Sequence, residues 1–399
     1  MKKRLISLLV IISVSACCFF GCTAEEKTEN KDSAIINNSV FKLGLLLDDD
    51  SSSDLTEKGF KYANSLANKV NINEIVEIET HIEKFTSAED VESKSDMLIN
   101  SGISAVVMNI KDEDSFNKAC DIFKNENIAV ISLSPFEYES DNFNKLSLSS
   151  EYITSCALSY AKEKNYSETA LLLESDSDFY KSFAETYTAT HKSYLGTEPT
   201  VYYMSGNSKN YTPDALCGGS YSSVFIYNIN NEENAVSELR KSGYTGEIIL
   251  PECFDKSNYK NEIYNNCSVI SKTEYDTANN ISTVFYNSFG ELNNLSTDDI
   301  SASVAYGYDA YMVIFEALKS FSTNENNSIF KNNTEETTKA EETKEILSSD
   351  FIKALFQVTY FGVTDTITFN NSKSIPTYIY VDYIINSQVF TGNKYIFNN

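Results

Sequence analysis

Tryptophan is absent from this 399-residue chain, and basic residues are scarce. Lysine and arginine together number 32, against 57 aspartates and glutamates, which gives a formal net charge of −25. This balance excludes a nucleic-acid partner, because phosphate binding requires a surplus of lysine and arginine. It also argues against a protein that lies flat on an anionic membrane. Without indole rings, any aromatic wall of a binding pocket must come from the 26 tyrosines and 24 phenylalanines.

Histidine is nearly absent, since His81 and His191 are the only two. The first falls in a predicted strand and the second in a predicted helix. Neither has a neighbour that would complete a metal-ligand pair or a Ser-His-Asp arrangement. The phosphate-binding loop G-x-x-x-x-G-K-[ST] is missing as well. We therefore expect no catalytic residue, no metal site and no cofactor, and a protein that is not an enzyme.

Cysteines are few beyond the first 22 residues, and they are widely spaced. The five that remain are Cys120, Cys156, Cys217, Cys253 and Cys267. An odd number without C-x-x-C spacing supports neither a disulfide framework nor a zinc site. We expect these side chains to be small buried hydrophobic groups, with a single Cys253–Cys267 bridge as the alternative.

A long hydrophobic run is also lacking at the amino terminus. The apolar segment 5–14, which follows Lys2, Lys3 and Arg4, has about half of the ~20 residues that a membrane-spanning helix needs. A basic start, a short apolar segment and a small residue before a cysteine are typical of an export signal. The pattern resembles the lipobox of bacterial lipoproteins. An ordinary cleaved signal peptide is the alternative.

Two cysteines of this leader could carry the lipid. Cys22 ends the segment Phe19-Phe20-Gly21-Cys22 and is followed at once by the polar stretch 23–38, whereas Cys17 fits the lipobox consensus better but would leave two phenylalanines after the cut. We favour Cys22, with 1–22 as signal peptide and anchor and 23–38 as a tether. Two acyl chains on one cysteine give stable attachment, so we expect the protein on the extracytoplasmic face of the bacterial cell membrane.

After the tether, short apolar runs alternate with segments of helical periodicity. Strands are predicted at 41–47, 76–82, 103–108 and 128–132, and helices at 60–70, 86–102 and 116–125. The second helix should begin with a capping box formed by Thr86 and Glu89. Strand–helix alternation predicts a parallel sheet that is covered on both faces.

The alternation restarts after a loop at 137–149. Strands are predicted at 169–173, 200–204, 223–227 and 247–250, with helices between them, and 302–321 forms a strongly apolar helix. The polar stretch 322–346 has almost nothing to bury, so we expect a disordered insertion. Two β-rich segments, 364–369 and 377–385, close the chain.

Four segments carry a resemblance to a known family. These are "ALLLESDSDFYKSFAETY" from Ala170, "ILPECF" from Ile249, "AYGYDAYMVIFEAL" from Ala305 and "FGVTDTITFNN" from Phe361. In order and spacing they resemble the type I periplasmic-binding-protein fold, specifically the branched-chain amino-acid-binding proteins of ABC transporters. Asp365 and Asn370 stand where that family has glycine and aspartate.

The resemblance implies an α/β fold of two Rossmann-like lobes with parallel central sheets. Residues 39–148 and 275–370 would form lobe 1, and 149–274 and 371–399 lobe 2. A small polar ligand, an amino acid or a related compound, would bind in the cleft between the lobes. The protein, expected to be a monomer, would deliver this ligand to the membrane permease of an ABC transporter. A lipoprotein that reports ligand to a membrane sensor, or a degenerate surface protein without a ligand, would have the same sequence pattern.

The resemblance also places the candidate site in the second half. Glu252 matches the position of a glutamate that pairs with the ligand ammonium, and Tyr180 matches a ligand-contacting tyrosine. Tyr227 and Asn228, at the end of another strand, could line the same wall.

The first half departs from the family pattern. Ser132 and Ser134 follow the fourth strand, but Phe136 stands at an expected hydroxyl, and acids fill 112–114 where the family has serine. These acids would repel a ligand carboxylate inside a cleft. Either Lys111 or the helix start at Ser115 binds an anion, or the ligand is cationic or neutral, with the acids at 48–50 near the rim.

Overall fold

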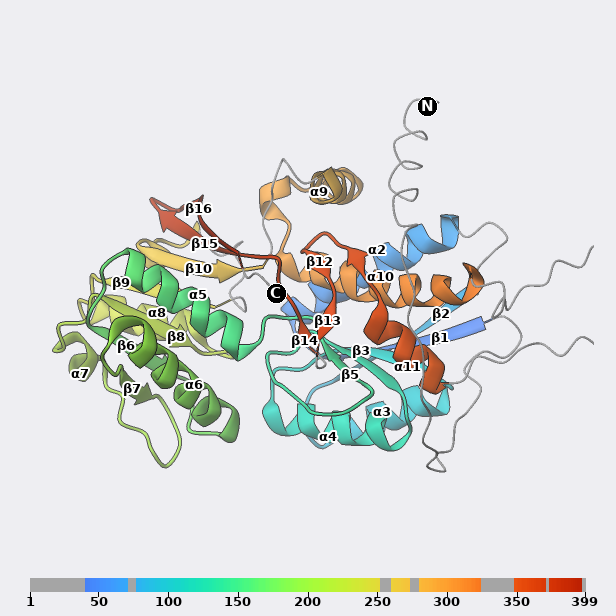
Figure 1. The fold of residues 1–399 in the computed structure, drawn as a ribbon, viewed down its shortest axis with the longest axis horizontal. Helices are drawn as coiled ribbons and strands as arrows, with labels where there is room; N and C mark the ends of the chain where they lie inside the picture. Colours follow the sequence, from blue (N-terminus) through green and yellow to red (C-terminus); the bar gives the residue numbers. More distant parts are fainter. Residues whose placement is uncertain are drawn as a thin grey trace, which may run out of the picture.

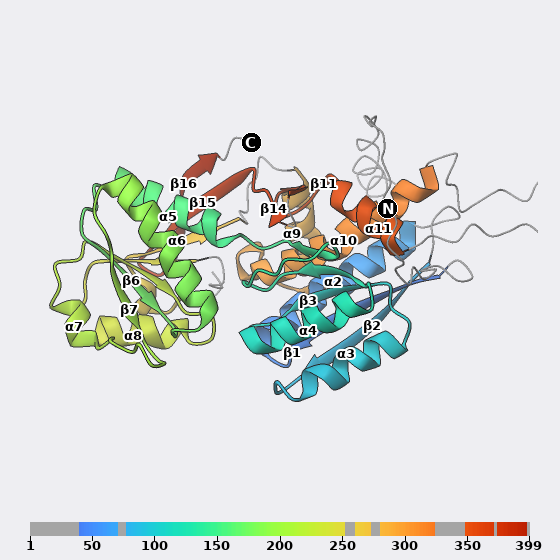
Figure 2. The same cartoon turned by 60° about the horizontal axis from the view of Figure 1, so that its bottom comes forward.

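The computed structural model describes residues 40–70, 77–251, 260–272, 280–323, 348–370 and 373–396. The predicted leader with Cys17 and Cys22, the tether, Glu252, Cys253 and all but the first two residues of the predicted insertion lie outside these ranges. Figures 1 and 2 show two α/β bodies side by side along the longest axis of the molecule.

Seven strands form the first sheet, in the order β13-β14-β5-β4-β3-β1-β2. Their bounds are β1 (Val40–Asp48), β2 (Glu77–Phe85), β3 (Ala105–Asn109), β4 (Ala129–Ser132), β5 (Phe143–Lys145), β13 (Phe369–Asn370) and β14 (Lys373–Ser374). All neighbours are parallel except β13 and β14, which pair antiparallel. We call this sheet lobe 1, together with its helices α2 (Ser51–Val70), α3 (Asp90–Asn100), α4 (Glu113–Asn125), α9 (Asn280–Asn293), α10 (Ala302–Thr323) and α11 (Ser348–Gln357).

Strand β1 lies between β2 and β3 in lobe 1 and is buried on both faces. Leu43, Leu45 and Leu47 pack in the cluster that contains α2, α10 and α11, whereas Leu46 packs with the α3 and α4 side. Because successive side chains of a strand point to opposite faces, the nearly continuous apolar run becomes two core layers.

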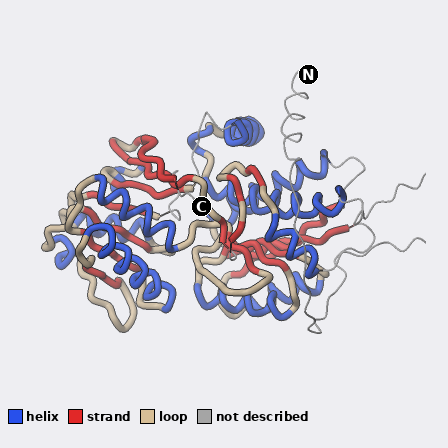
Figure 3. The backbone as a smooth tube through the Cα atoms, viewed as in Figure 1, coloured by secondary structure: helices blue, strands red, loops and turns tan. Residues whose placement is uncertain are grey.

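The second sheet repeats this plan, in the order β16-β15-β10-β9-β8-β6-β7. Its strands are β6 (Thr169–Leu173), β7 (Thr200–Tyr203), β8 (Ser223–Tyr227), β9 (Glu247–Leu250), β10 (Cys267–Ser271), β15 (Tyr378–Ile385) and β16 (Gln388–Ile396). The five strands β6–β10 run parallel, and β15 and β16 are antiparallel additions. With α5 (Ser150–Glu163), α6 (Asp178–Leu195), α7 (Pro213–Cys217) and α8 (Glu232–Lys241) this sheet forms lobe 2; Figure 3 shows the two sets of strands separately.

The chain passes between the lobes three times, after β5, after β10 and after β14. The buried Lys272 side chain joins these passages, because its ammonium donates to the carbonyl of Leu146 at 3.1 Å and to the hydroxyl of Ser374 at 2.8 Å. We expected the chain to enter lobe 2 at residue 371, but β14 still pairs with β5. The last passage therefore begins after Ser374.

Two local predictions differ from the structure. The expected capping box is absent, because Thr86 donates to Asp90 at 3.0 Å and the helix begins only at Asp90. The loop predicted at 137–149 contains β5, whose three residues carry too short a pattern to be recognised. None of the described helices meets the length and apolarity that crossing a bilayer requires.

Candidate ligand-binding site

The order of the strands marks one crevice in each sheet. In lobe 1, β1 has the next strand of the chain, β2, on one side and β3 on its other side. In lobe 2, β6 likewise lies between β7 and β8. Ligands of open parallel sheets bind outside the carboxyl ends of the strands at such a reversal. The residues that follow β1, β3, β6 and β8 are therefore the first candidates for a site.

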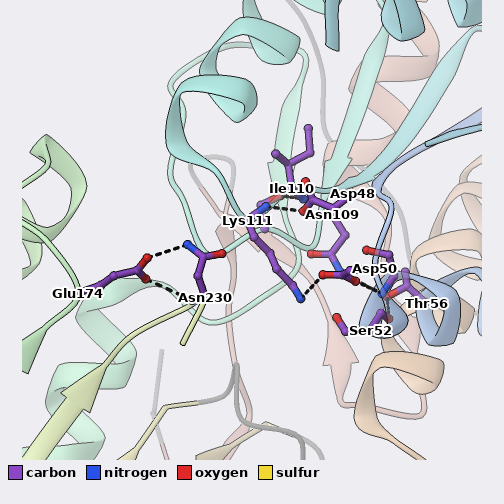
Figure 4. A network of polar contacts seen from close by, with 11 residues as sticks. Asp48, Asp50, Ser52, Thr56, Asn109, Ile110, Lys111, Glu174 and Asn230 are labelled. Atoms are coloured by element: carbon purple, nitrogen blue, oxygen red, sulfur yellow. Dashed lines mark hydrogen bonds and ion pairs between the residues drawn. The ribbon is translucent and has the colours of Figure 1, made fainter. Parts of the chain in front are cut away.

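In lobe 1 these residues form a charged network. The Asp48 carboxylate accepts from the Lys111 backbone amide at 2.8 Å, and the Lys111 ammonium donates to Asp50 at 2.6 Å. Asp50 also accepts from the backbone amide of Ser53 at 2.7 Å, at the start of α2. Figure 4 shows Asp48, Asp50 and Lys111 on the lobe 1 side of the view. The only lysine of this network is thus already paired.

The two aspartates of the network differ in their affinity for a proton. Burial raises the pKa of Asp48 to about 6, and the nearby charge of Asp50 adds to this effect, although the Lys111 amide opposes it. Burial would also raise the pKa of Asp50, but hydrogen bonds from Lys111 and Ser53 outweigh it and hold that pKa below its usual value. Near neutral pH both carboxyl groups are therefore mostly ionised, and the crevice of lobe 1 is negatively charged.

In lobe 2 the crevice contains Glu174, directly after β6. Its carboxylate accepts from the Tyr180 hydroxyl at 2.7 Å, from the Ile229 amide at 2.9 Å and from the Asn230 side chain at 2.8 Å. Figure 4 places Glu174 and Asn230 on the lobe 2 side, opposite Lys111. We did not predict Glu174 from the sequence, although an acid directly after a buried strand is a signal for such a site.

Three of the residues that we predicted in lobe 2 lie near the Glu174 carboxylate. Tyr180 is buried and donates to Glu174, and Tyr227 is buried against Phe179, Tyr180 and Phe183. Asn228 accepts from the Asn231 amide at 2.7 Å, just before α8. The structure thus brings Tyr180 and Tyr227 into contact beside Glu174, and Asn228 directly follows Tyr227. Their role toward a ligand stays a prediction, as does that of Glu252, which lies outside the described residues.

The predicted serines of lobe 1 are buried and hydrogen-bonded within that lobe. Ser134 accepts from the Ile110 amide at 2.7 Å, and Ser132 accepts from the Ser134 amide at 3.1 Å. Ser115 donates its hydroxyl to Asp112 at 2.6 Å, and its amide donates to the same carboxylate at 2.9 Å. Asp112 therefore caps α4, at the helix start that we considered as an anion site.

The carboxyl-terminal edges of the two sheets meet at α6. Glu113 of lobe 1 accepts from the Ser177 hydroxyl at 2.6 Å and from the Phe179 amide at 2.9 Å, both in lobe 2. Beside these bonds the Phe136 and Phe179 rings pack edge to face, with their centroids 5.0 Å apart. The two crevices therefore lie on edges that face each other.

Neither histidine lies in this site. His191 is buried between the hydroxyl of Thr169 and the carbonyl of Thr197, each at 2.7 Å, and His81 lies within 3.1 Å of Glu79. Within the described ranges no group of three or more His, Cys, Asp or Glu side chains could hold a metal ion. Cys120, Cys156, Cys217 and Cys267 are free thiols, and the alternative Cys253–Cys267 bridge involves a residue outside the described ranges.

Comparison with known proteins identifies the fold. No family model matches the sequence, and no curated protein does. The structure matches the leucine-binding protein LivK of Thermotoga maritima with a TM-score of 0.70 at 12% identity, over 89% of this chain and 98% of that one. The substrate-binding protein LivJ of Streptococcus pneumoniae, in complex with isoleucine, matches with a TM-score of 0.70 at 15% identity, over 90% and 99% of the two chains. This chain has the type I periplasmic-binding-protein fold.

The same fold accommodates other ligands in its solved examples. A solute-binding protein of an ABC transporter from R. palustris, in complex with benzoate, matches with a TM-score of 0.69 at 8% identity, over 89% of this chain and 96% of that one. All three structures are described as binding or transport proteins. At these identities the likeness shows the type I periplasmic-binding-protein fold.

Proposed function

We propose that this chain is an extracytoplasmic solute-binding lipoprotein, which binds a small polar ligand between its two lobes and delivers it to the permease of an ABC transporter. The observation that carries the proposal is the pair of facing crevices, one at each strand-order reversal, each lined by charged and amide side chains. Closure of two such edges around a solute would exclude water and strengthen the polar contacts inside. No cofactor is needed for this activity.

The charges around the crevices favour a cationic or neutral polar ligand over one whose main feature is a carboxylate. Lys111 is paired with Asp50, Asp112 caps the start of α4, and Glu113 occupies the start of α6. The ammonium of Lys111 and the amino termini of α4 and α6 could otherwise bind an anion, but each already binds a carboxylate of the chain itself. Asp48 and Glu174 add further negative charge to the two facing edges.

A thermal-shift screen of amino acids, amines, short peptides and nucleosides tests the proposal. A ligand at 100 times its dissociation constant stabilises a one-site protein by about 2.7 kcal/mol. We expect the largest shifts from cationic or neutral polar compounds and none from benzoate. Asn230→Ala should weaken the binding of any compound found in the screen roughly tenfold, because the ligand loses a hydrogen bond to the Asn230 side chain, next to the Glu174 carboxylate.

The control is Asn125→Ala, an exposed residue at the end of α4, which should bind as the wild type does. Glu252→Ala tests the position that only the family resemblance suggests. A screen in which no compound of any class raises the melting temperature would contradict the proposed function.

A further inference from the structure

Glu113 makes contacts that its own helix does not require. It is the first residue of α4, and the N-cap of that helix is supplied by Asp112. The Glu113 side chain instead reaches lobe 2, where its two oxygens accept from Ser177 and from the Phe179 amide. These partners are 64 and 66 residues away along the chain.

Helix α6 in turn depends on lobe 1 for its cap. Ser177 is its N-cap residue, yet the Ser177 side chain makes no capping bond within the helix. Its hydroxyl donates to Glu113, and the Phe179 amide, one of the amides that lack a partner in the first turn, donates to the same carboxylate. A carboxylate at a helix amino terminus is also favoured by the helix dipole. The anion that stabilises α6 therefore comes from the opposite lobe.

Aromatic packing lies beside this half-buried contact. Phe136 and Phe179 are 3% and 9% exposed, and their rings lie against each other across the two lobes. Phe136 also packs on Phe116 of α4, and Phe179 packs on Tyr227 of β8. One apolar cluster consequently runs from α4 to β8. Charged hydrogen bonds next to such a cluster are stronger than on an exposed surface.

We propose that Glu113 is an interlobe latch: its carboxylate holds the carboxyl-terminal edges of the two lobes together. Opening the lobes would break both hydrogen bonds and expose Phe136 and Phe179. Glu113 thereby positions the two crevices relative to each other, and the strength of this contact sets how readily the site opens. The inference does not depend on which ligand the protein binds.

Hydroxyl-radical footprinting of the ligand-free full-length chain tests the latch. Glu113→Gln should increase the oxidation of Phe136 and Phe179 together, roughly tenfold, because a hydrogen bond to a charged group is lost. Phe123 and Phe225, each 0% exposed in the core of one lobe, should stay protected and show that both lobes are folded. The matched control Asp114→Asn removes an equal charge from the next residue of α4, which is exposed, and should leave the pattern unchanged.

Ser177→Ala removes one of the two hydrogen bonds to Glu113 from the side of lobe 2, without a change of charge. It therefore tests the latch if Glu113→Gln fails to fold. We expect it to expose the same two phenylalanines. A rise confined to Phe179 would show only fraying of α6 and would overturn the latch, as would an unchanged pattern. Because no ligand is used, a failure of the ligand screen would not affect this result.

Discussion

Asp309 is the residue at which two separate sequence motifs meet. It belongs to the "AYGYDAYMVIFEAL" segment, which forms α10, and its carboxylate accepts from the Val363 amide at 2.9 Å and from the Thr364 amide and hydroxyl, each at 2.7 Å. Those partners belong to the "FGVTDTITFNN" segment. A Cβ atom on Gly362 would lie 2.6 Å from the Asp309 carboxylate, so the turn can approach the helix only with glycine there. The two motifs are thus one structural contact.

Replacement of Asp309 tests this contact. In the native protein Oδ2 accepts both hydrogen bonds from Thr364, and Oδ1 accepts the bond from Val363. In Asp309→Asn an NH2 group replaces one of these two oxygens. Depending on the orientation of the asparagine side chain, this NH2 group faces either Thr364 or Val363. At least one buried backbone amide loses its acceptor, and we expect the free energy of unfolding to fall by about 1–3 kcal/mol at pH 7. Chemical denaturation measures this change. Asp350→Asn, an exposed acid in the first turn of α11, is the control and should change the stability by less than about 0.5 kcal/mol.

The difference in stability between the wild type and Asp309→Asn should also depend on pH, because Asp309 can take up a proton. Burial raises its pKa from 3.8 to about 6, although the bonds from Thr364 and Val363 oppose the rise. Between these two values the native state holds a proton that the unfolded state has released, so this contribution to stability grows as the pH falls. From pH 7 to pH 4 the wild type should gain up to about 3 kcal/mol relative to Asp309→Asn. A constant difference between the two proteins would show that this carboxyl does not take up a proton in that range.

At the scale of elements, the three passages between the lobes are held together by side chains from different parts of the chain. Lys272 bonds to Leu146 in the first passage and to Ser374 at the third. The Asp365 carboxylate accepts from the Thr377 amide at 2.7 Å, just before β15. This bond ties the turn after β11 (Tyr360–Phe361) to the last passage.

Lys272→Met should loosen this junction. Methionine keeps the bulk of the side chain but leaves the Leu146 carbonyl without this donor in a buried place, so we expect a loss of about 1–3 kcal/mol in the free energy of unfolding. Lys260→Met is the control, because Lys260 is exposed and pairs with Asp299 at the surface, where ion pairs contribute little. Equal stabilities of the two variants by chemical denaturation would argue against a structural role for Lys272.

At the scale of the whole molecule, the two lobes are repeats of one plan. Both sheets have the same reversal in strand order, so closing one lobe on the other brings equivalent edges together. We propose that a lipid on Cys22 keeps this pair of lobes beside its membrane partner, while the tether 23–38 lets them reorient.

Metabolic labelling with palmitate tests the anchor. In a bacterial host Cys22→Ala should abolish the label and release the protein from the membrane fraction, because the lipid chains provide the attachment. Cys17→Ala should keep both the label and the membrane location. The reverse pattern would assign the lipid to Cys17, and the absence of label from the wild-type protein would indicate an ordinary signal peptide.

Much of the fold could be predicted from local patterns. The runs at 169–173, 223–227 and 247–250 coincide with β6, β8 and β9, because a strand buried on both faces has a continuous apolar run that few other elements have. Short or polar elements escaped prediction: β5 has three residues, and α11 is separated from α10 by a polar stretch. Their positions depend on partners that lie far away in the sequence.

The sequence by itself determined the alternation of strands and helices, the excess of acids and the places where polar residues follow buried strands. Only the tertiary structure decided which partner each of those polar groups binds within the chain. Asp112, Asp50 and Glu113 are similar acids in the sequence, yet one caps its own helix, one pairs with Lys111 and one reaches the opposite lobe. The reason is physical: a hydrogen bond is fixed by distance and direction in space, and partners more than 60 residues apart leave no mark in local spacing.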